Sequence, residues 1–160
     1  MPTDLLRTEN IRLELDGAIA TLTMTRPERL NAMSPGLVDD FHSALDALAR
    51  CREARVVILA GEGRGFCAGL DLQEYGKWTI AHGLDSVEGG LAVQERIATL
   101  VPRMREARQP FVAAVNGAAA GGNSKFQYSS SFSSPARNTA VCAGGNFKMP
   151  SNAVSGSGTH

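Results

Sequence analysis

Apolar and polar residues alternate along two stretches near the start of the chain, residues 11–15 and 19–24. This period of two residues is typical of strands that bury one face against a core. Asp16 and Gly17 lie between the two stretches, and an Asp-Gly pair favours the tight turn of a β-hairpin. The pattern therefore predicts two antiparallel strands joined at Asp16 and Gly17.

The apolar residues that follow recur with the period of a helix. Ser34 is suited to the N-cap of this helix, and Pro35 to its first position. One face carries the apolar residues, which are Leu37, Phe41, Ala44, Leu45 and Leu48. A second amphipathic helix is predicted over residues 91–107, with a kink at Pro102.

Two short apolar runs, residues 56–60 and 111–115, each lead into a loop of small residues. The first loop is the glycine-rich segment 61–72, and the second is the segment 116–122. Glycine leaves room for the main chain to approach a ligand closely. Strands that alternate with glycine-rich loops and helices are typical of an α/β fold that binds ligands at the strand ends. We therefore expect two backbone N–H groups to converge on one ligand oxygen.

Phosphate is the first candidate ligand of such loops. Residues 61–66 match only the front of the dinucleotide-binding fingerprint, because Phe66 occupies its last Gly/Ala position. No Gly-Lys-Ser/Thr sequence follows either loop, which excludes a P-loop. Turns with a purely structural role remain the alternative to a ligand site.

Composition narrows the class of protein. The 160 residues fit one domain, and 43% hydrophobic residues are enough for a core. The formal net charge is zero, which argues against a nucleic-acid-binding or membrane-surface protein. No apolar run is long enough to span a membrane, and the first residues do not resemble a signal peptide. Cys51, Cys67 and Cys142 lack metal-ligand spacing and are expected to be reduced thiols of a soluble cytoplasmic protein without a metal.

Composition changes sharply after Gly122. Residues 1–122 carry all sixteen acidic residues and all fifteen leucines, whereas residues 123–160 carry no Leu, Ile, Asp or Glu but nine serines. A segment of this kind buries too little apolar surface to offset the entropy of ordering it. The sequence therefore predicts a domain over residues 1–122 and a Ser/Gly/Asn-rich disordered tail over residues 123–160.

Four stretches of the domain together resemble the N-terminal half of the crotonase superfamily, the enoyl-CoA hydratase/isomerase proteins. The stretches are residues 21–33, 56–61, 65–72 and 110–122, and the resemblance covers roughly residues 10–122. It implies a spiral of ββα turns, here truncated after about two turns. Members of this superfamily usually form trimers, often paired as hexamers.

The resemblance also implies a chemistry, that of an enoyl-CoA hydratase (a lyase) or an isomerase of fatty acid metabolism. Its substrate is an acyl-CoA thioester, no separate cofactor is needed, and backbone N–H groups stabilise the enolate oxygen. The implied donors are the amides of Ala68 and Gly122. The implied substrate- and CoA-binding residues are Arg26, Arg29, Ala32, Ala68, Gly69, Leu70, Asp71 and Gly122. A solvated surface position is the alternative for either arginine, and a helix N-cap is the preferred role for Asp71.

The sequence departs from the superfamily beyond the second loop. Asn123 stands where a third glycine is usual, and Lys125 stands where hydratases carry a glutamate. No carboxylate follows residue 122, so the second acid/base group of the hydratases has no counterpart either. The alternative function is therefore an inactive truncated fragment that binds CoA or co-assembles with a full-length homologue. Without the rest of the fold, the apolar face of residues 37–48 and the last strand are expected to be partly exposed.

Overall fold

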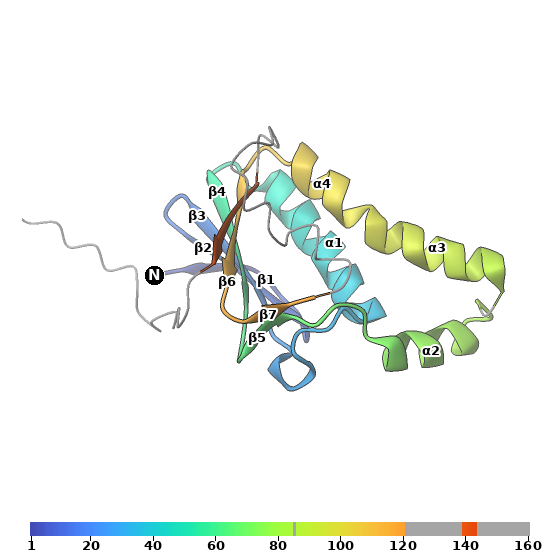
Figure 1. Ribbon diagram of the computed structural model, residues 1–160. Helices are drawn as coiled ribbons and strands as arrows, with labels where there is room; N and C mark the ends of the chain where they lie inside the picture. Colours follow the sequence, from blue (N-terminus) through green and yellow to red (C-terminus); the bar gives the residue numbers. More distant parts are fainter. Residues whose placement is uncertain (85, 121–138, 144–160) are drawn as a thin grey trace, which may run out of the picture.

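The computed structural model describes residues 1–84 and 86–120, and the backbone of residues 139–143. A six-stranded sheet with the order β1-β2-β3-β4-β6-β8 is its main element (Figure 1). Its strands are β1 (Thr3–Arg7), β2 (Ile11–Asp16), β3 (Ile19–Met24), β4 (Val56–Gly61), β6 (Phe111–Val115) and β8 (Thr139–Ala143). The pairs β1–β2 and β2–β3 are antiparallel, and the other three pairs are parallel.

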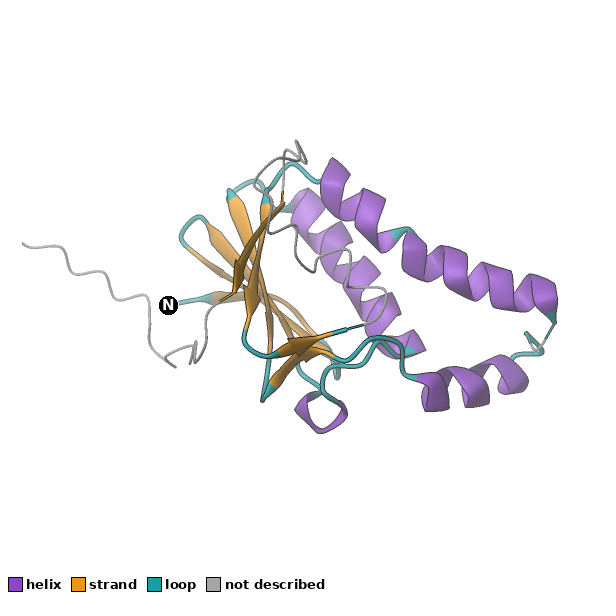
Figure 2. Ribbon diagram, viewed as in Figure 1, coloured by secondary structure: helices purple, strands orange, loops and turns teal. Residues whose placement is uncertain are grey.

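Helices cover one side of this sheet (Figure 2). The long helix α1 (Pro35–Arg50) lies against it, and α4 (Leu100–Glu106) lies beside α1. Helices α2 (Leu72–Ala81) and α3 (Val87–Ala98) extend away from the sheet, and we call them the helical arm. A short 3-10 helix, η1 (Pro27–Arg29), and a two-stranded parallel sheet of β5 (Gly65–Cys67) and β7 (Ala118–Ala119) complete the described elements.

The N-terminal hairpin is confirmed. Strands β2 and β3 pair from Ile11 with Met24 to Asp16 with Ile19. Gly17 lies in the turn with a φ of 57°, a left-handed value that glycine adopts without strain. Strand β1 was not predicted, since its sequence lacks alternation, and its pairing with β2 shifts register between Asp4 and Leu6.

Helix α1 begins as the sequence predicts. The Ser34 hydroxyl accepts a hydrogen bond from the Leu37 N–H at 3.1 Å, which caps the helix. The expected exposure of its apolar face is wrong, because the chain's own sheet covers that face. The side chains of Leu37, Phe41, Leu45 and Leu48 are all buried in one core with residues of β2, β3, β4 and β6. On the last parallel strand with described side chains, Phe111 and Ala113 are buried as well.

The helix predicted over residues 91–107 is two helices. The first, α3, starts earlier than predicted, at Val87, and Ser86 caps it. The break falls at Thr99, three residues before Pro102. Proline cannot donate to the carbonyl four residues earlier and crowds that carbonyl, so the predicted disturbance is confirmed as a break.

Strands β4 and β6 lie where the two apolar runs predict them. Within the segment that the sequence predicts to be a disordered tail, residues 139–143 form strand β8, which pairs in parallel with β6 from Phe111–Thr139 to Val115–Ala143. The proposed boundary at Gly122 and the remainder of residues 123–160 lie outside the described residues.

Candidate functional site

The two glycine-rich loops leave neighbouring strands at the same edge of the sheet. Strands β4 and β6 run parallel, with Ala60 next to Ala114 near their carboxyl ends. The loops that follow pair again through β5 and β7, and the Ala120 N–H donates to the Cys67 carbonyl at 2.9 Å. The fold therefore brings the two loops predicted to hold a ligand side by side.

The contact between the loops is close enough to require glycine. A Cβ atom on Gly117 would lie 2.1 Å from the Arg64 carbonyl oxygen. A Cβ atom on Gly61 would lie 2.7 Å from the Phe66 carbonyl oxygen. Both distances are far below a van der Waals contact, so a side chain at Gly117 would force the two loops apart, and one at Gly61 would distort the first loop itself.

A third segment, residues 26–33, runs alongside the first loop (Figure 1). The Ala68 N–H donates to the Leu30 carbonyl at 3.0 Å, and the Met33 N–H donates to the Gly69 carbonyl at 2.7 Å. The Asp71 N–H donates in turn to the Met33 carbonyl at 2.9 Å. Residues 30–33 therefore act as a short parallel partner of residues 68–71.

This ladder corrects one predicted role. The Ala68 N–H, expected to stabilise a ligand oxygen, already has the Leu30 carbonyl as its acceptor. The N–H groups of Gly69 and Leu70 have no acceptor among residues 1–84 and 86–120. The second predicted donor, Gly122, lies outside the described residues, as do Asn123 and Lys125.

The segment 26–33 has an unusual backbone. Leu30 and Asn31 are consecutive non-glycine residues with positive φ, 50° and 53°. Asparagine tolerates this left-handed conformation, whereas leucine adopts it at a cost. The Asn31 carboxamide oxygen accepts from the Arg26 N–H at 3.0 Å, which closes the segment on itself.

The two arginines of this segment are both engaged by carboxylates. The Arg26 side chain is buried, so the alternative of a solvated surface arginine is wrong for it. Its guanidinium donates to the Ala32 carbonyl at 2.7 Å and to Glu74 at 2.6 Å, and lies 3.5 Å from Asp71. Arg29 is more exposed and binds Asp71 at 3.0 Å.

Asp71 is the centre of this charge network, and its predicted role as an N-cap is confirmed. Its carboxylate accepts from the Glu74 N–H at 3.2 Å at the start of α2. Burial opposes ionisation of Asp71, but hydrogen bonds from Arg29 and Glu74 and the charges of Arg29 and Arg26 outweigh it. The pKa of Asp71 is therefore below its usual value.

The structure brings together the predicted site residues that it describes, which come from two segments of the chain. Ala68, Gly69, Leu70 and Asp71 are brought against the segment that contains Arg26, Arg29 and Ala32. Sequence reasoning missed Asn31, Asn116 and Glu74, whose side chains tie these segments together. A signal existed for Asn116, since it directly follows a buried strand at the start of a glycine-containing turn.

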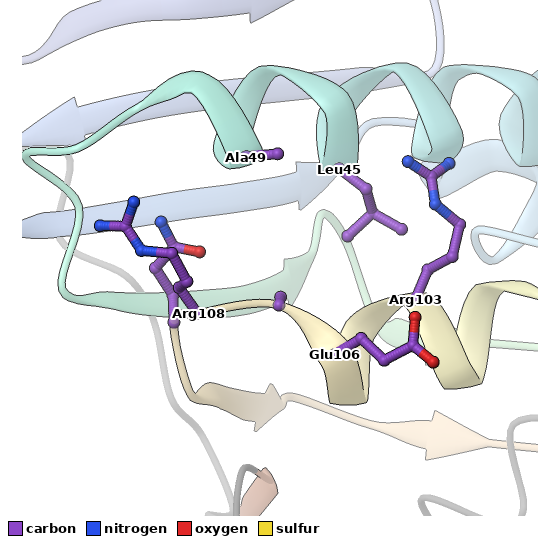
Figure 3. A pocket seen from close by; sticks show the side chains of 7 residues that line it. Leu45, Ala49, Arg103, Glu106 and Arg108 are labelled. Atoms are coloured by element: carbon purple, nitrogen blue, oxygen red, sulfur yellow. The ribbon is translucent and has the colours of Figure 1, made fainter.

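A shallow pocket lies away from these loops (Figure 3). Leu45 and Ala49 of α1 line one side, and Arg103 and Glu106 of α4 line the other, with Arg108 at the end. These residues lie where α1 and α4 end, just before β4 and β6 begin. The pocket is therefore at the opposite edge of the sheet from the glycine-rich loops.

The described residues contain neither a membrane-spanning helix nor a metal-binding cluster of side chains. No helix among them is long and apolar enough to cross a membrane. No three side chains of His, Cys, Asp or Glu gather there in a group that could hold a metal ion. The candidate site consists of the backbone groups of the paired loops and the Asp71 charge network.

The chain is similar to known proteins over most of its length. The family model of enoyl-CoA hydratase/isomerase matches residues 14–143, from β2 to the end of β8. A probable enoyl-CoA hydratase of Mycobacterium leprae is 34% identical over 104 residues, which cover 65% of this chain and 35% of the relative. A 1,2-epoxyphenylacetyl-CoA isomerase of Escherichia coli is 34% identical over 113 residues, which cover 71% and 42%.

Solved structures give the same result. The crystal structure of an enoyl-CoA hydratase/carnitine racemase from Magnetospirillum magneticum superimposes with a TM-score of 0.64 and 30% identity, covering 72% of this chain and 42% of that one. The chain thus spans about two fifths of the length of such relatives. The match includes both glycine-rich loops and the segment 26–33. The chain belongs to the enoyl-CoA hydratase/isomerase family, the crotonase superfamily.

Proposed function

We propose that the chain binds an acyl-CoA thioester at the paired glycine-rich loops and stabilises the enolate form of its carbonyl oxygen. The pairing of β5 with β7 supports this proposal, because it brings the two loops into contact at the carboxyl ends of β4 and β6. Backbone N–H groups held in place before the reaction stabilise developing negative charge without reorganisation. Enoyl-CoA hydration and double-bond isomerisation both develop such charge on the thioester oxygen.

Leu70 is the donor that we propose in the first loop, in place of Ala68. The ladder with residues 30–33 uses the Gly69 carbonyl and the Asp71 N–H, which flank Leu70. In a parallel pairing of this kind, the N–H of the residue between such bonds points away from the partner strand. The Leu70 N–H is therefore directed away from segment 26–33, has no acceptor within the described part of the chain, and can donate to a ligand oxygen.

The charge network suggests which arginine would meet the CoA phosphates. The guanidinium of Arg26 is buried and already bound by Ala32 and Glu74. Arg29 is partly exposed at the surface of the same segment and is the better candidate. Its contact with Asp71 leaves part of its planar donor group for a phosphate, which arginine binds well.

The experiment compares two replacements of Leu70. Leu70→Pro removes the proposed donor without removing a ladder hydrogen bond, and Leu70→Ala retains the N–H. Binding is measured with acetoacetyl-CoA, whose enolate forms readily, and with unacylated CoA. We expect Leu70→Pro to weaken acetoacetyl-CoA binding about 10- to 100-fold, from the roughly 1.5–3 kcal/mol of a hydrogen bond to a charged group, and to leave CoA binding unchanged.

Equal loss in both variants would show that the Leu70 side chain, and not its N–H, supports binding. No binding of either ligand by the parent chain would overturn the proposal. Circular dichroism of each variant guards against misfolding.

A second function is favoured by the composition of the residues after the second loop. Residues 123–160 contain no Asp or Glu, and Lys125 stands where the resemblance places a carboxylate. General acid/base catalysis needs a group whose pKa lies near the working pH, which a lysine in place of a carboxylate does not ordinarily supply. This favours a fragment that binds CoA without turnover, or one that joins a full-length homologue.

Two measurements separate the candidates. Steady-state hydration of crotonyl-CoA by the purified chain would identify an active hydratase, whereas ligand binding with no turnover would identify a binding fragment. Size-exclusion chromatography, with and without a full-length relative, tests co-assembly. We expect binding without hydration.

A further inference from the structure

We propose that Asn31 and Asn116 are positioning residues that together clamp the turn between β4 and β5. The turn covers residues 61–65 and contains three glycines, one of which, Gly63, has a φ of 81°. Such a turn has little conformational preference of its own. Two side chains from distant parts of the sequence supply the hydrogen bonds that fix it.

Asn31 holds the turn from the side of segment 26–33. Its side chain is fully buried, and its amide nitrogen donates to the carbonyls of Glu62 and Gly65, both at 2.9 Å. Its oxygen accepts from the Arg26 N–H at 3.0 Å. The same carboxamide therefore ties the turn to the segment that pairs with residues 68–71.

Asn116 holds the turn from the side of the second loop. It follows the last residue of β6, and its amide nitrogen donates to the carbonyls of Gly61 at 3.0 Å and Gly63 at 2.7 Å. Next to it, the close approach of Gly117 to Arg64 keeps the two loops in contact. Asn116 therefore fixes the position of the turn relative to the end of β6.

The chemistry of the contacts requires a carboxamide at both positions. Four of the five carbonyls of the turn are acceptors of these two NH₂ groups, and a carbonyl can only accept. The orientation of Asn116 is fixed by its two acceptors, although this leaves its buried oxygen without a donor among the described residues. Aspartate has the same shape but no donor, so it would place negative charge against two carbonyl oxygens.

The turn leads directly into β5 and then into residues 68–71. A shift of the turn therefore shifts the Leu70 N–H, and this functional consequence rests on the proposed function. The clamp itself rests on the hydrogen bonds alone. The two asparagines touch no proposed ligand atom and act through the turn.

The test uses Asn116→Asp in the full chain, with Asn10→Ala as the matched control. Asn10 also donates from its amide nitrogen, to Asp40 at 2.7 Å, but contacts neither loop. Hydrogen–deuterium exchange is followed in residues 66–72 and, as an internal reference, in α1. Loss of two net hydrogen bonds predicts about tenfold or faster exchange in residues 66–72, with α1 and the Asn10→Ala protein unchanged there.

Unchanged exchange in residues 66–72 would overturn the clamp. If Asn116→Asp loses protection throughout α1 as well, the test is repeated with Asn116→Ala, which removes the donors without adding charge. Faster exchange in residues 66–72 with unchanged exchange in α1 then supports the clamp, and any other result overturns it. Binding separates the clamp from the proposed function. We expect Asn116→Asp to weaken acetoacetyl-CoA binding more than CoA binding, and a parent chain that binds neither would refute the proposed function while the exchange result still judges the clamp.

Discussion

The loops around the candidate site and the helical arm are consecutive in the sequence but are stabilised in different ways. Residues 61–71 are held by backbone pairing, two asparagine side chains and the contacts of Asp71. Helices α2 and α3, which follow, expose Leu72, Ile80, Val87 and Leu91. Residues 61–71 are thus held in place by polar contacts, whereas the helical arm exposes apolar side chains and has few contacts with the rest of the chain.

The arm owes its helices mainly to local features. Within the fully described helix α2, Tyr75 is the one buried side chain, and α3 buries Val93 and Gly89. Its caps are well formed, with Asp71 at the start of α2 and Ser86 at the start of α3. Helices with so little apolar burial depend on caps and helix propensity, so changes there have small effects on the whole fold.

The largest contrast is expected between core and arm side chains. Leu37 on α1 is buried in the core, whereas Ile80 on α2 is 72% exposed. Leu37→Ala should lower the free energy of unfolding by about 2–5 kcal/mol, and Ile80→Ala should change it by less than about 0.5 kcal/mol. Urea unfolding monitored by circular dichroism measures both. Similar losses from the two variants would show that the arm is packed against something in solution.

Replacing a glycine by alanine is expected to change stability in opposite directions in the two regions. Gly117→Ala places a methyl group against the Arg64 carbonyl and should lower the free energy of unfolding by about 1–3 kcal/mol. Gly76 lies inside α2 with open space around it, so Gly76→Ala should raise the stability of the arm by about 0.5–1 kcal/mol. Thermal unfolding of each variant gives the sign. A destabilised Gly76→Ala would contradict the open position of this residue.

Asp71 joins the two regions, and its removal tests how firmly they are joined. Asp71→Ala deletes the α2 cap and the partner of Arg29, and should cost about 1–2 kcal/mol. Asp71→Asn retains a capping oxygen and serves as the matched variant. Hydrogen exchange should show loss of protection at the start of α2 in Asp71→Ala, with α1 unaffected. Protection lost equally in α1 would mean that the arm and the core unfold together.

The smallest expected effect is the dependence of this contact on pH. Because the pKa of Asp71 is lowered in the folded chain, its charge stabilises the fold above its unfolded pKa of about 4. That contribution is lost as the pH falls through the lowered value. The stability difference between the parent and Asp71→Asn should therefore be constant near neutral pH and shrink below about pH 4. If the stability difference between the parent and Asp71→Asn persists below about pH 4, the effect of the substitution comes from the shape of the side chain and not from its charge.

The same comparison explains how far sequence reasoning reached. Strands β2, β3, β4 and β6 and helix α1 were predicted because their apolar periods, turns and caps agree with the core that they build. The pairing of the two glycine-rich loops was also predictable, since both follow parallel buried strands. Strand β1 and the start of α3 were missed because neither carries a clear period.

Long-range polar contacts were beyond what the sequence could specify. Ala68 was expected to offer its N–H to a ligand, but the Leu30 carbonyl, far away in the sequence, occupies it. Arg26 was expected either to bind CoA or to lie in solvent, yet Glu74 and Ala32 bind it in the interior. Which N–H is free and which charge is paired depends on pairing partners that appear only once the chain is folded.

Consecutive left-handed residues at Leu30 and Asn31 bear on the order of events during folding. This backbone is unfavourable for leucine in an isolated peptide, and its compensating contacts come from the turn 61–65 and from Ala68. The hairpin of β2 and β3 closes a short loop and can form before the turn 61–65 and Ala68 are in place. Segment 26–33 depends on those residues and cannot form before them. Segment 26–33 is synthesised early but is therefore expected to reach its final conformation late, after residues 61–68 have packed against it.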